Sequence, residues 1–258
     1  MQLEVHDSGL ILLRPNWEVP QHVKSFVSTR AGGVSSGLYA SLNLGSHVGD
    51  HHDHVQHNRA KVRALLPSEP LWLKQVHGTQ IWSEKLPQLE ADGAVTSYDN
   101  HVLSIMAADC MPLLFCDQEG DIIAACHGGW RGLSQHIVAK TVQQMLFEKK
   151  PDDSQKYLSG ISVYLGPCIG PNHFEVGLDV VNAFHQNGES LMKDAFQVGS
   201  NHGKYYANLF KIATLQCQLL GIGRIFTEEI CCFEESKLFF SHRRDKQTGR
   251  FASFLWKH

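Results

Sequence analysis

The sequence predicts an α/β (α+β) fold in which layers of strands and helices are mixed. Compact apolar runs of strand length alternate with segments that carry apolar residues at helical spacing. Turn-forming residues 118–121 join two of the apolar runs directly, which indicates a hairpin and argues against an uninterrupted βαβ array. No internal repeat, low-complexity segment or clear linker divides the 258 residues, so the length fits one large domain as well as two.

The predicted strands are short apolar runs that end at glycine, proline or polar turn residues. They cover residues 23–30, 71–76, 102–107, 113–117, 122–126, 161–165, 225–228 and 251–256. The first strand leads into the glycine-rich segment 31–37, and the run 161–165 leads into a second Gly/Pro segment, 166–171. A strand that stops at Gly or Pro leaves its last side chain at the rim of the sheet, where functional residues tend to lie.

Helices are predicted between these strands, over residues 53–66, 133–149, 178–186 and 208–220. The last has a clear apolar stripe and a glycine C-cap; these residues are Leu209, Ile212, Leu215, Leu219 and Gly221. Residues 149–156 are polar, which indicates a long surface loop between a helix and a strand.

The composition argues against several classes of protein. A net charge of −3 and a pI of about 6.6 argue against a surface for nucleic-acid polymers. The basic run 243–246 is interrupted by an acid and, taken alone, indicates a solvated turn. Seven cysteines, an odd number, argue against a full disulfide framework. No apolar stretch reaches transmembrane length and no secretory pattern begins the chain, so we expect a cytoplasmic protein, with nothing that demands more than a monomer.

Three potential soft-metal ligands lie where apolar runs break into glycine or proline. They are His77 in QVHG, Cys110 in DCMP and His127 in HGGWRG. Two imidazoles and a thiolate suit a catalytic zinc with an open fourth position, and copper is the competing metal. A lone histidine or cysteine is more often structural, and the spacing matches no zinc-finger rule. From the residues alone, a shared metal and three unrelated side chains both remain open.

Two aspartates accompany these ligands. Asp109 precedes Cys110, and Asp92 lies in the sequence ADG. Either could orient a ligand histidine or act as a base. The competing interpretation is a turn aspartate that bonds its own backbone, and it is strongest for Asp92, which Gly93 follows.

Two arginines are placed to bind phosphate. Arg30 ends a predicted strand, and Arg131 follows Trp130 just before a predicted helix. Guanidinium groups pair well with phosphate oxygens, although either arginine could instead form a surface salt bridge. Trp130 could stack on a planar base or could simply pack.

Cysteine chemistry is the main alternative to a metal. Cys110 could form a nucleophilic pair with His127 or His77. Sequence cannot separate a thiolate that attacks from one that binds metal. Two candidate histidines, rather than one histidine with an Asn or Asp, favour the metal.

Eight motifs occur together in one order along the chain. They are STRAGGVS (28–35), SLNLG (41–45), QVHG (75–78), ADG (91–93), ADCMPL (108–113), HGGWRG (127–132), LGPCIGP (165–171) and RRD (243–245). In this order they resemble the YfiH-like family, also called the laccase-domain or multicopper polyphenol oxidase family, whose members are described as purine nucleoside phosphorylases. The resemblance runs from about Ser28 to Trp256, nearly the whole chain.

The resemblance implies one domain over residues 1–258, an α/β/β/α layered sandwich with mixed sheets, distantly similar to the catalytic domain of cytotoxic necrotizing factor. It implies zinc, with copper possible, held by residues matching His77, Cys110 and His127. It implies phosphorolysis of adenosine, inosine and methylthioadenosine to the base and ribose 1-phosphate, with adenosine deamination alongside. The partners would be a purine nucleoside and phosphate.

The same resemblance suggests which residues line the pocket. Arg30, Asn43, Gln75 and Arg131 fall in matching motifs and are expected to bind substrate. The chain departs from the family pattern at Gly129, where alanine is expected, and at Cys168 and His242. Cys168 could compete as a fourth ligand and close the site.

Rival functions follow from the same residues. One is a copper-dependent polyphenol oxidase (laccase), but a multicopper oxidase needs a trinuclear histidine cluster, and the one His-x-His pair, His52 and His54, lies in a polar stretch. Another is a thiol hydrolase or amidase acting on cell-wall peptide intermediates. The third is a non-catalytic binding module with a structural metal.

Overall fold

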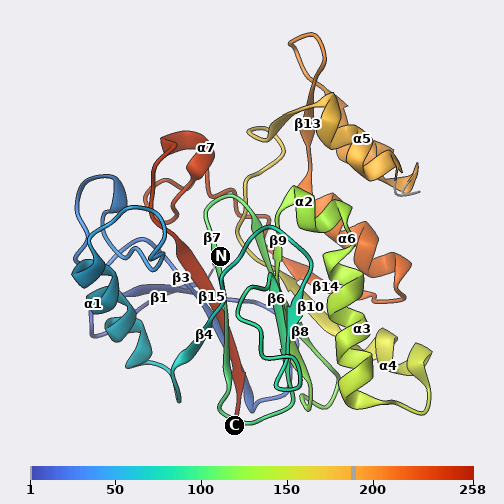
Figure 1. Cartoon of the computed structure of the whole chain (residues 1–258), viewed down its shortest axis with the longest axis horizontal. Coiled ribbons are helices and arrows are strands. Elements are labelled where there is room, and N and C mark those ends of the chain that lie inside the picture. Colours follow the sequence, from blue (N-terminus) through green and yellow to red (C-terminus); the bar gives the residue numbers. More distant parts are fainter. Residues whose placement is uncertain (1, 187–189) are drawn as a thin grey trace.

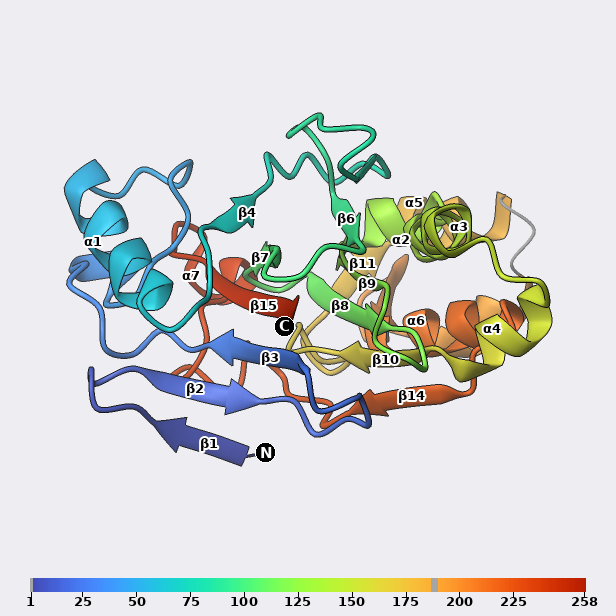
Figure 2. The same cartoon turned by 90° about the horizontal axis from the view of Figure 1, so that it is seen from below.

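The computed structural model describes residues 2–186 and 190–258, and its sheets and helices form four layers (Figures 1 and 2). From left to right, Figure 1 shows α1, one sheet, a second sheet, and then helices α3, α4 and α6. This arrangement confirms the predicted α/β class and its α/β/β/α layering. The single domain over residues 1–258 and the likeness to cytotoxic necrotizing factor stay predictions.

The first sheet has the C-terminal strand near its centre. Its strand order is β1 (Gln2–Val5), β2 (Ile11–Arg14), β3 (Val23–Ser28), β15 (Phe251–Lys257), β7 (Val102–Ala107) and β4 (Pro70–Trp72). Neighbouring strands are antiparallel, except that β4 and β7 are parallel. β15 is buried along its whole length because both of its faces are covered.

The second sheet carries the strands nearest the candidate ligands. Its order is β14 (Arg224–Thr227), β10 (Ser162–Leu165), β8 (Met111–Cys116), β9 (Ile123–Gly128), β6 (Gly93–Thr96) and β5 (Ile81–Trp82). β8 and β9 form the predicted hairpin, with Cys116 opposite Ile123. β10 is parallel to β14, and β5 is parallel to β6.

The helical segments of the described residues are η1 (Gly37–Tyr39), α1 (His52–Arg63), α2 (Trp130–Ser134), α3 (Ile137–Lys149), α4 (Ser154–Gly160), α5 (Leu178–Gln186), η2 (Ser190–Ala195), α6 (Leu209–Leu219) and α7 (His242–Asp245). Of these, α1 covers the outer face of the first sheet, and α3, α4 and α6 cover that of the second (Figure 1). The side chains of Asp153, Asn208 and Ser241 each accept a backbone N–H bond from the third residue after them, and so begin α4, α6 and α7. No helix in the described part of the chain is long and apolar enough to cross a membrane.

A small third sheet projects beyond the layers. It contains β11 (Glu175–Gly177), β13 (Lys204–Ala207) and β12 (Phe196–Val198), and with α5 it forms the protrusion at the top of Figure 1. The helix predicted over 178–186 is confirmed as α5, whereas the three strands were not predicted. These strands are only three or four residues long, so their alternation is too brief to recognise.

The core has two parts because the first sheet is covered on both faces. On one face, Phe26, Phe254 and Trp256 pack with Val62 of α1. On the other, residues such as Leu255 meet the apolar side chains of the second sheet, and that cluster continues to α3 and α6. Both sheets are therefore rigid supports for the loops at their rims.

Three predicted elements differ from the structure. The helix predicted over 133–149 is interrupted, because His136 has a left-handed backbone (φ 65°) that separates α2 from α3. Residues 149–156 are not wholly a loop, since Asp153 caps α4 there. The strand predicted over 71–76 ends at Trp72.

Gln75 explains the early end of that strand. Its side-chain amide donates to the carbonyl of Met106 at 2.9 Å and accepts the N–H of Met106 at 2.9 Å. A side chain thus makes the pair of hydrogen bonds that a strand backbone would make with β7. The backbone of residues 76–78 is free to turn away and bond elsewhere.

Candidate active site

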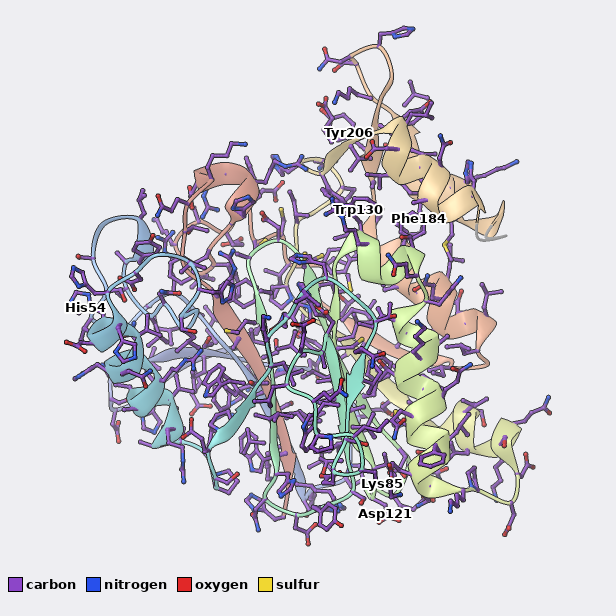
Figure 3. All side chains as sticks on the ribbon, in the orientation of Figure 1. His54, Lys85, Asp121, Trp130, Phe184 and Tyr206 are labelled. Atoms are coloured by element: carbon purple, nitrogen blue, oxygen red, sulfur yellow. The ribbon has the colours of Figure 1, made fainter. Side chains whose placement is uncertain are left out.

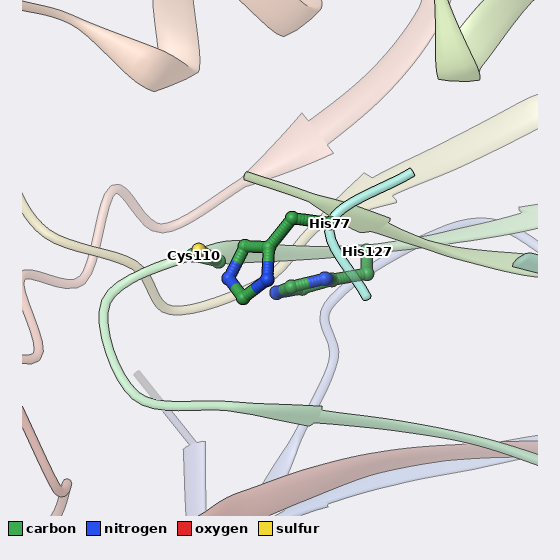
Figure 4. Close-up of side chains that lie close together, drawn as sticks. All are labelled: His77, Cys110 and His127. Atoms are coloured by element: carbon green, nitrogen blue, oxygen red, sulfur yellow. The ribbon is translucent and has the colours of Figure 1, made fainter. Parts of the chain in front are cut away.

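His77, Cys110 and His127 come together at one rim of the two sheets (Figure 4). Their ligand atoms all lie within 4.8 Å of one another. His77 is exposed on the segment after β4, Cys110 is half-buried in the loop between β7 and β8, and His127 is buried in β9. The three residues therefore converge on a point that solvent can reach from the His77 side.

Strand pairing accounts for this convergence. In the β8–β9 hairpin Pro112 lies opposite His127, which brings the loop holding Cys110 to the same sheet edge. Gly93 of β6 lies opposite Cys126, so Asp92 stands beside His127. The backbone N–H of His127 donates to the carbonyl of Asp92 at 2.7 Å.

Asp92 holds two of the three ligands. Its buried carboxylate accepts a hydrogen bond from Nδ1 of His127 at 3.0 Å. It also accepts the backbone N–H groups of Val76, His77 and Gly78 at 3.1, 2.9 and 2.7 Å. These bonds hold His77 in a left-handed conformation (φ 60°), which is uncommon for a residue other than glycine. Asp92 is thus more than a turn residue that bonds only its own backbone.

The charges of these groups depend on one another. Burial acts to raise the pKa of Cys110, but the neighbouring His127 and His77 outweigh it and lower that pKa to about 6. Burial acts to lower the pKa of His127, but Cys110 and Asp92 outweigh it and raise that pKa to about 9. Burial also opposes ionisation of Asp92, yet its bonds to His127 and to the backbone lower its pKa. Both shifts act in the same sense, because they favour a thiolate at Cys110 beside an imidazolium at His127 in the metal-free protein.

The residues fit a soft divalent metal. A thiolate and two imidazoles are ligands that zinc and copper bind well. The hydrogen bond to Asp92 occupies Nδ1 of His127 and leaves Nε2 for an ion, which is the usual carboxylate–histidine support of metal ligands. Gly129 leaves room, because a Cβ there would lie 3.0 Å from the Cys110 sulfur and 3.2 Å from Cδ2 of His77.

A pocket of about 350 Å³ opens over these ligands. This volume lies within the range typical of small-molecule sites, about 300–1,000 Å³. Besides the three ligands, it is lined by His47, Gln75, Met106, Ala107, Ala108, Asp109, Arg131, Ile169, Phe174, His242, Arg243 and Arg250. Several cationic groups and one thiolate face the same space, so the pocket suits an anion together with an apolar ring.

Asp109 lies in the pocket lining, but its carboxylate is directed to the α7 segment. It accepts hydrogen bonds from the Ser241 hydroxyl and the Arg243 backbone N–H, each at 2.6 Å, and from the Cys232 thiol at 3.2 Å. Within residues 2–186 and 190–258 it bonds neither ligand histidine. Its backbone is left-handed (φ 98°), and this places Cys110 at the turn into β8.

The four residues expected to bind substrate are divided by the structure. Gln75 and Arg131 line the pocket. The Arg131 guanidinium lies over the Trp130 ring at 4.4 Å and has no hydrogen-bond partner among the described residues. It is therefore available to a ligand.

Arg30 and Asn43 do not line this pocket. Arg30 donates to the carbonyls of Ala40 and Ser236 at 2.8 and 3.0 Å and lies over the Phe240 ring. Asn43 is buried, and its side-chain oxygen accepts the backbone N–H of Arg250 at 2.9 Å. Both connect loops around the pocket.

Four cationic or basic residues of the pocket were not predicted as site residues: His47, His242, Arg243 and Arg250. Burial, together with Arg250 and Arg59, lowers the pKa of His47 and so favours its neutral form. No local pattern indicates His47 or Arg250, because both lie in irregular segments that meet only in the fold. Arg243 stood in a recognised motif.

The basic run 243–246 is not simply a solvated turn. The Arg243 guanidinium donates to the carbonyls of His173 and Glu175 at 3.3 and 2.8 Å. Arg244 donates to the carbonyls of Cys232, Phe233 and Phe239. The run was misinterpreted because backbone carbonyls, which leave no trace in sequence, satisfy both arginines.

Cys168 is fully buried and does not belong to the ligand group of His77, Cys110 and His127. Burial raises its pKa well above the ordinary value, which disfavours the thiolate. The His-x-His pair lies elsewhere, on α1. Figure 3 shows His54 at the outer side of that helix, whereas Trp130, beside the candidate site, lies on α2 across the two sheets.

Comparison with known proteins gives consistent matches over nearly the whole chain. Residues 24–258 match the family described as multi-copper polyphenol oxidoreductase laccase. A Haemophilus influenzae protein named purine nucleoside phosphorylase is 43% identical over 251 residues, which cover 95% of this chain and 98% of that protein. An Escherichia coli protein named purine nucleoside phosphorylase YfiH is 40% identical over 250 residues, with coverage of 95% and 98%. The crystal structure of a Neisseria meningitidis protein has a TM-score of 0.85 at 37% identity and covers 95% of this chain and 98% of its own.

Proposed function

The chain belongs to the multi-copper polyphenol oxidoreductase laccase family, and we propose that it is a metal-dependent purine nucleoside phosphorylase. The proposed reaction converts adenosine, inosine or methylthioadenosine and phosphate into the free base and the ribosyl 1-phosphate. The names of the Haemophilus and Escherichia relatives support the reaction class. The cytoplasmic location and the monomeric state stay predictions.

One observation carries this proposal: His77, Cys110 and His127 line the same pocket as three arginines. Arg131, Arg243 and Arg250 all face the space above His77 and Cys110. Phosphorolysis brings one strongly anionic co-substrate, phosphate, next to a neutral nucleoside. A guanidinium group can bind two phosphate oxygens at once through a pair of hydrogen bonds.

We assign phosphate to Arg131 and Arg250. The Arg131 guanidinium has no hydrogen-bond partner among the described residues and lies over the Trp130 ring. Arg250 uses its Nη1 for the carbonyls of Thr248 and Gly249, both at 3.0 Å, and these bonds fix its direction. Its remaining N–H groups can face the pocket. Two oriented cations would hold phosphate for attack on the anomeric carbon, which becomes cationic as the bond to the base breaks.

We assign the purine to the apolar part of the lining. Phe174, Met106 and Ile169 provide planar and flexible apolar surface. The imidazoles of His47 and His242 face the same pocket and can hydrogen-bond a ring nitrogen of the departing base. Protonation of that nitrogen makes the base a better leaving group.

His77, Cys110 and His127 would hold the metal, for which we propose zinc. When bound, the ion would supply Lewis-acid polarisation of an oxygen atom in the pocket. Asp92 keeps His127 oriented and supplies negative charge behind it. Because Asp92 is buried and its pKa is lowered, we assign it positioning rather than proton transfer.

We also propose adenosine deamination at the same pocket, with water in place of phosphate. The polar groups around the ligand trio would position that water against the amino-bearing carbon. Adenosine and water, without phosphate, should then yield inosine and ammonia, and loss of His77 should abolish these products together with phosphorolysis.

The decisive experiment follows inosine cleavage by metal-analysed protein with and without phosphate. Hypoxanthine and ribose 1-phosphate are expected only when phosphate is present, and His77→Ala should lose the activity. His57→Ala removes an exposed histidine of α1 and is the matched control, which should retain it. Hypoxanthine formed equally well without phosphate would contradict phosphorolysis.

A specific observation favours a second candidate, a thiol hydrolase or amidase acting on peptides such as cell-wall intermediates. Cys110, His127 and Asp92 form a chain of thiolate, imidazolium and carboxylate like that of cysteine hydrolases. The two candidates differ in their inhibitors. Hydrolase activity would be lost on alkylation of Cys110 and would persist in the presence of a chelator. Phosphorylase activity would be lost with either treatment.

The family description also suggests copper-dependent polyphenol oxidation. One His₂Cys trio corresponds to only a part of a multicopper centre. Oxygen uptake with a phenol by copper-loaded protein, and none by zinc-loaded protein, would favour this third candidate.

A further inference from the structure

Outside the pocket, a second group of metal-binding side chains lies where two loops meet. His173, Cys231 and Glu234 each offer a ligand atom, and these atoms all lie within 4.8 Å of one another. His173 belongs to the loop before β11, while Cys231 and Glu234 belong to the loop after β14. We propose that these three residues form a second zinc site, separate from the pocket and independent of whether the protein is a phosphorylase.

The surroundings of Cys231 are those expected of a thiolate that binds a metal. Cys231 is buried, with 8% of the residue exposed, and its sulfur accepts the backbone N–H of Gly170 at 3.2 Å. A backbone N–H directed at sulfur stabilises negative charge there. A Cβ on Gly170 would lie 3.1 Å from both the sulfur and the Cβ of Cys231, so glycine is what permits this approach.

The histidine is also oriented before any ion binds. Its ring stacks on Phe233 with centroids 4.3 Å apart and planes 13° from parallel. Its Nε2 lies 2.8 Å from a carboxylate oxygen of Glu234. Glu234 is the exposed member of the group, so an ion could enter from solvent on that side and keep water as a further ligand.

The loops that carry the ligands are already joined by backbone hydrogen bonds. The N–H of Cys168 donates to the carbonyl of Ile230 at 3.2 Å, and the N–H of Cys232 donates to the carbonyl of Cys168 at 2.8 Å. Neighbouring cysteines therefore face different ways: Cys231 faces His173, and Cys232 faces Asp109. Little conformational entropy remains to be lost when an ion binds.

Charge distinguishes the two sites. One thiolate and one carboxylate neutralise a divalent ion at the second site, whereas a single thiolate leaves a net positive charge at the first. The first site therefore attracts an anion to its open coordination position, while the second suits a structural role. Phe174, next to His173, lines the pocket, so an ion here would stiffen the pocket wall.

The first test measures bound zinc per chain. Stripped full-length protein is dialysed against zinc and then against metal-free buffer before elemental analysis. Wild type should retain two ions, Cys231→Ala one, His77→Ala one, and the double variant none. If Cys231→Ala fails to fold, Glu234→Gln replaces it, because this change lies at an exposed position, and it should also retain one ion. Glu235→Gln is the matched control and should retain two ions. One ion in wild type, unchanged by Cys231→Ala and Glu234→Gln, would overturn the proposal.

The double variant also controls for the exposed histidines of α1, which it keeps. If it retains an ion, that ion belongs to the surface patch, and only the loss seen on changing Cys231 or Glu234 supports the second site.

The second test uses cobalt, because a cobalt–thiolate bond has its own charge-transfer absorption. In a Cys110→Ser background the band should persist, since Cys231 supplies the remaining thiolate, and it should vanish in Cys110→Ser/Cys231→Ser. A Cys110→Ser protein that is folded by circular dichroism and shows no band would rule the second site out. Failure of inosine cleavage would leave both measurements unaffected.

Discussion

The carboxylate of Asp92 lies 3.0 Å from Nδ1 of His127, and the same carboxylate accepts the backbone N–H of His77. One buried aspartate thus connects the two imidazoles of the site, although His77 lies on the segment after β4 and His127 lies in β9. Asp92 fixes the ring orientation of His127 and the backbone conformation of His77. It also keeps a negative charge next to these two histidines.

Asp92→Asn should weaken metal binding, because the amide removes that charge and presents an N–H₂ group to backbone N–H donors. We expect zinc or cobalt affinity to fall about 10–100-fold. Competition with a chromophoric chelator measures this. Asp121→Asn, which changes an exposed ion pair with Lys149, is the control and should bind normally. Unchanged affinity in Asp92→Asn would show that the bond to His127 is dispensable.

Cys110 should be the most reactive thiol of the metal-free protein. With its pKa lowered to about 6, the thiolate forms as the pH rises through that value, so alkylation should accelerate through pH 6 and then level off. His127→Ala should move this midpoint upward because a stabilising cation is lost. Mass spectrometry after iodoacetamide pulses gives the profile. A wild-type midpoint near that of a free cysteine would contradict the thiolate–imidazolium pair.

Substitution of Arg131 and substitution of Arg30 should have different effects on phosphate binding and on stability. Loss of a charge-assisted bond costs about 1.5–3 kcal/mol, so Arg131→Ala should raise the phosphate KM roughly 10–100-fold. Arg30→Ala should leave that KM unchanged and lower the unfolding free energy, because it loses its carbonyl contacts and Phe240. Steady-state kinetics at varied phosphate decides between them. A larger KM effect at Arg30 would reverse the assignment.

Asn43 should matter for stability rather than for substrate contact. Its buried amide bonds Gly45, Asp50 and the backbone of Arg250. Asn43→Ala leaves these groups unsatisfied, and we expect the free energy of unfolding to fall by about 1–3 kcal/mol. Urea denaturation measures the loss, with the exposed Asn16→Ala as reference. Normal stability combined with a raised nucleoside KM would instead restore the sequence-based prediction of direct binding.

Much of the fold was predictable because its strands are local signals. The runs 102–107 and 251–256 became β7 and β15, and the turn between β8 and β9 was recognised from four residues. Errors arose where a side chain replaced backbone pairing. The strand before His77 ends early because the Gln75 amide bonds Met106, and no hydrophobic pattern reports such a bond.

Local pattern was enough to single out His77, Cys110 and His127 as candidate ligands, because each stands where an apolar run meets glycine or proline and each is a residue type that metals bind. Packing alone decided which arginines face them. Asn43 meets Arg250 across 207 residues, and His173 meets Glu234 across 61. Which groups share a pocket or an ion depends on loops brought together by the sheets, and that proximity is a property of the whole folded core.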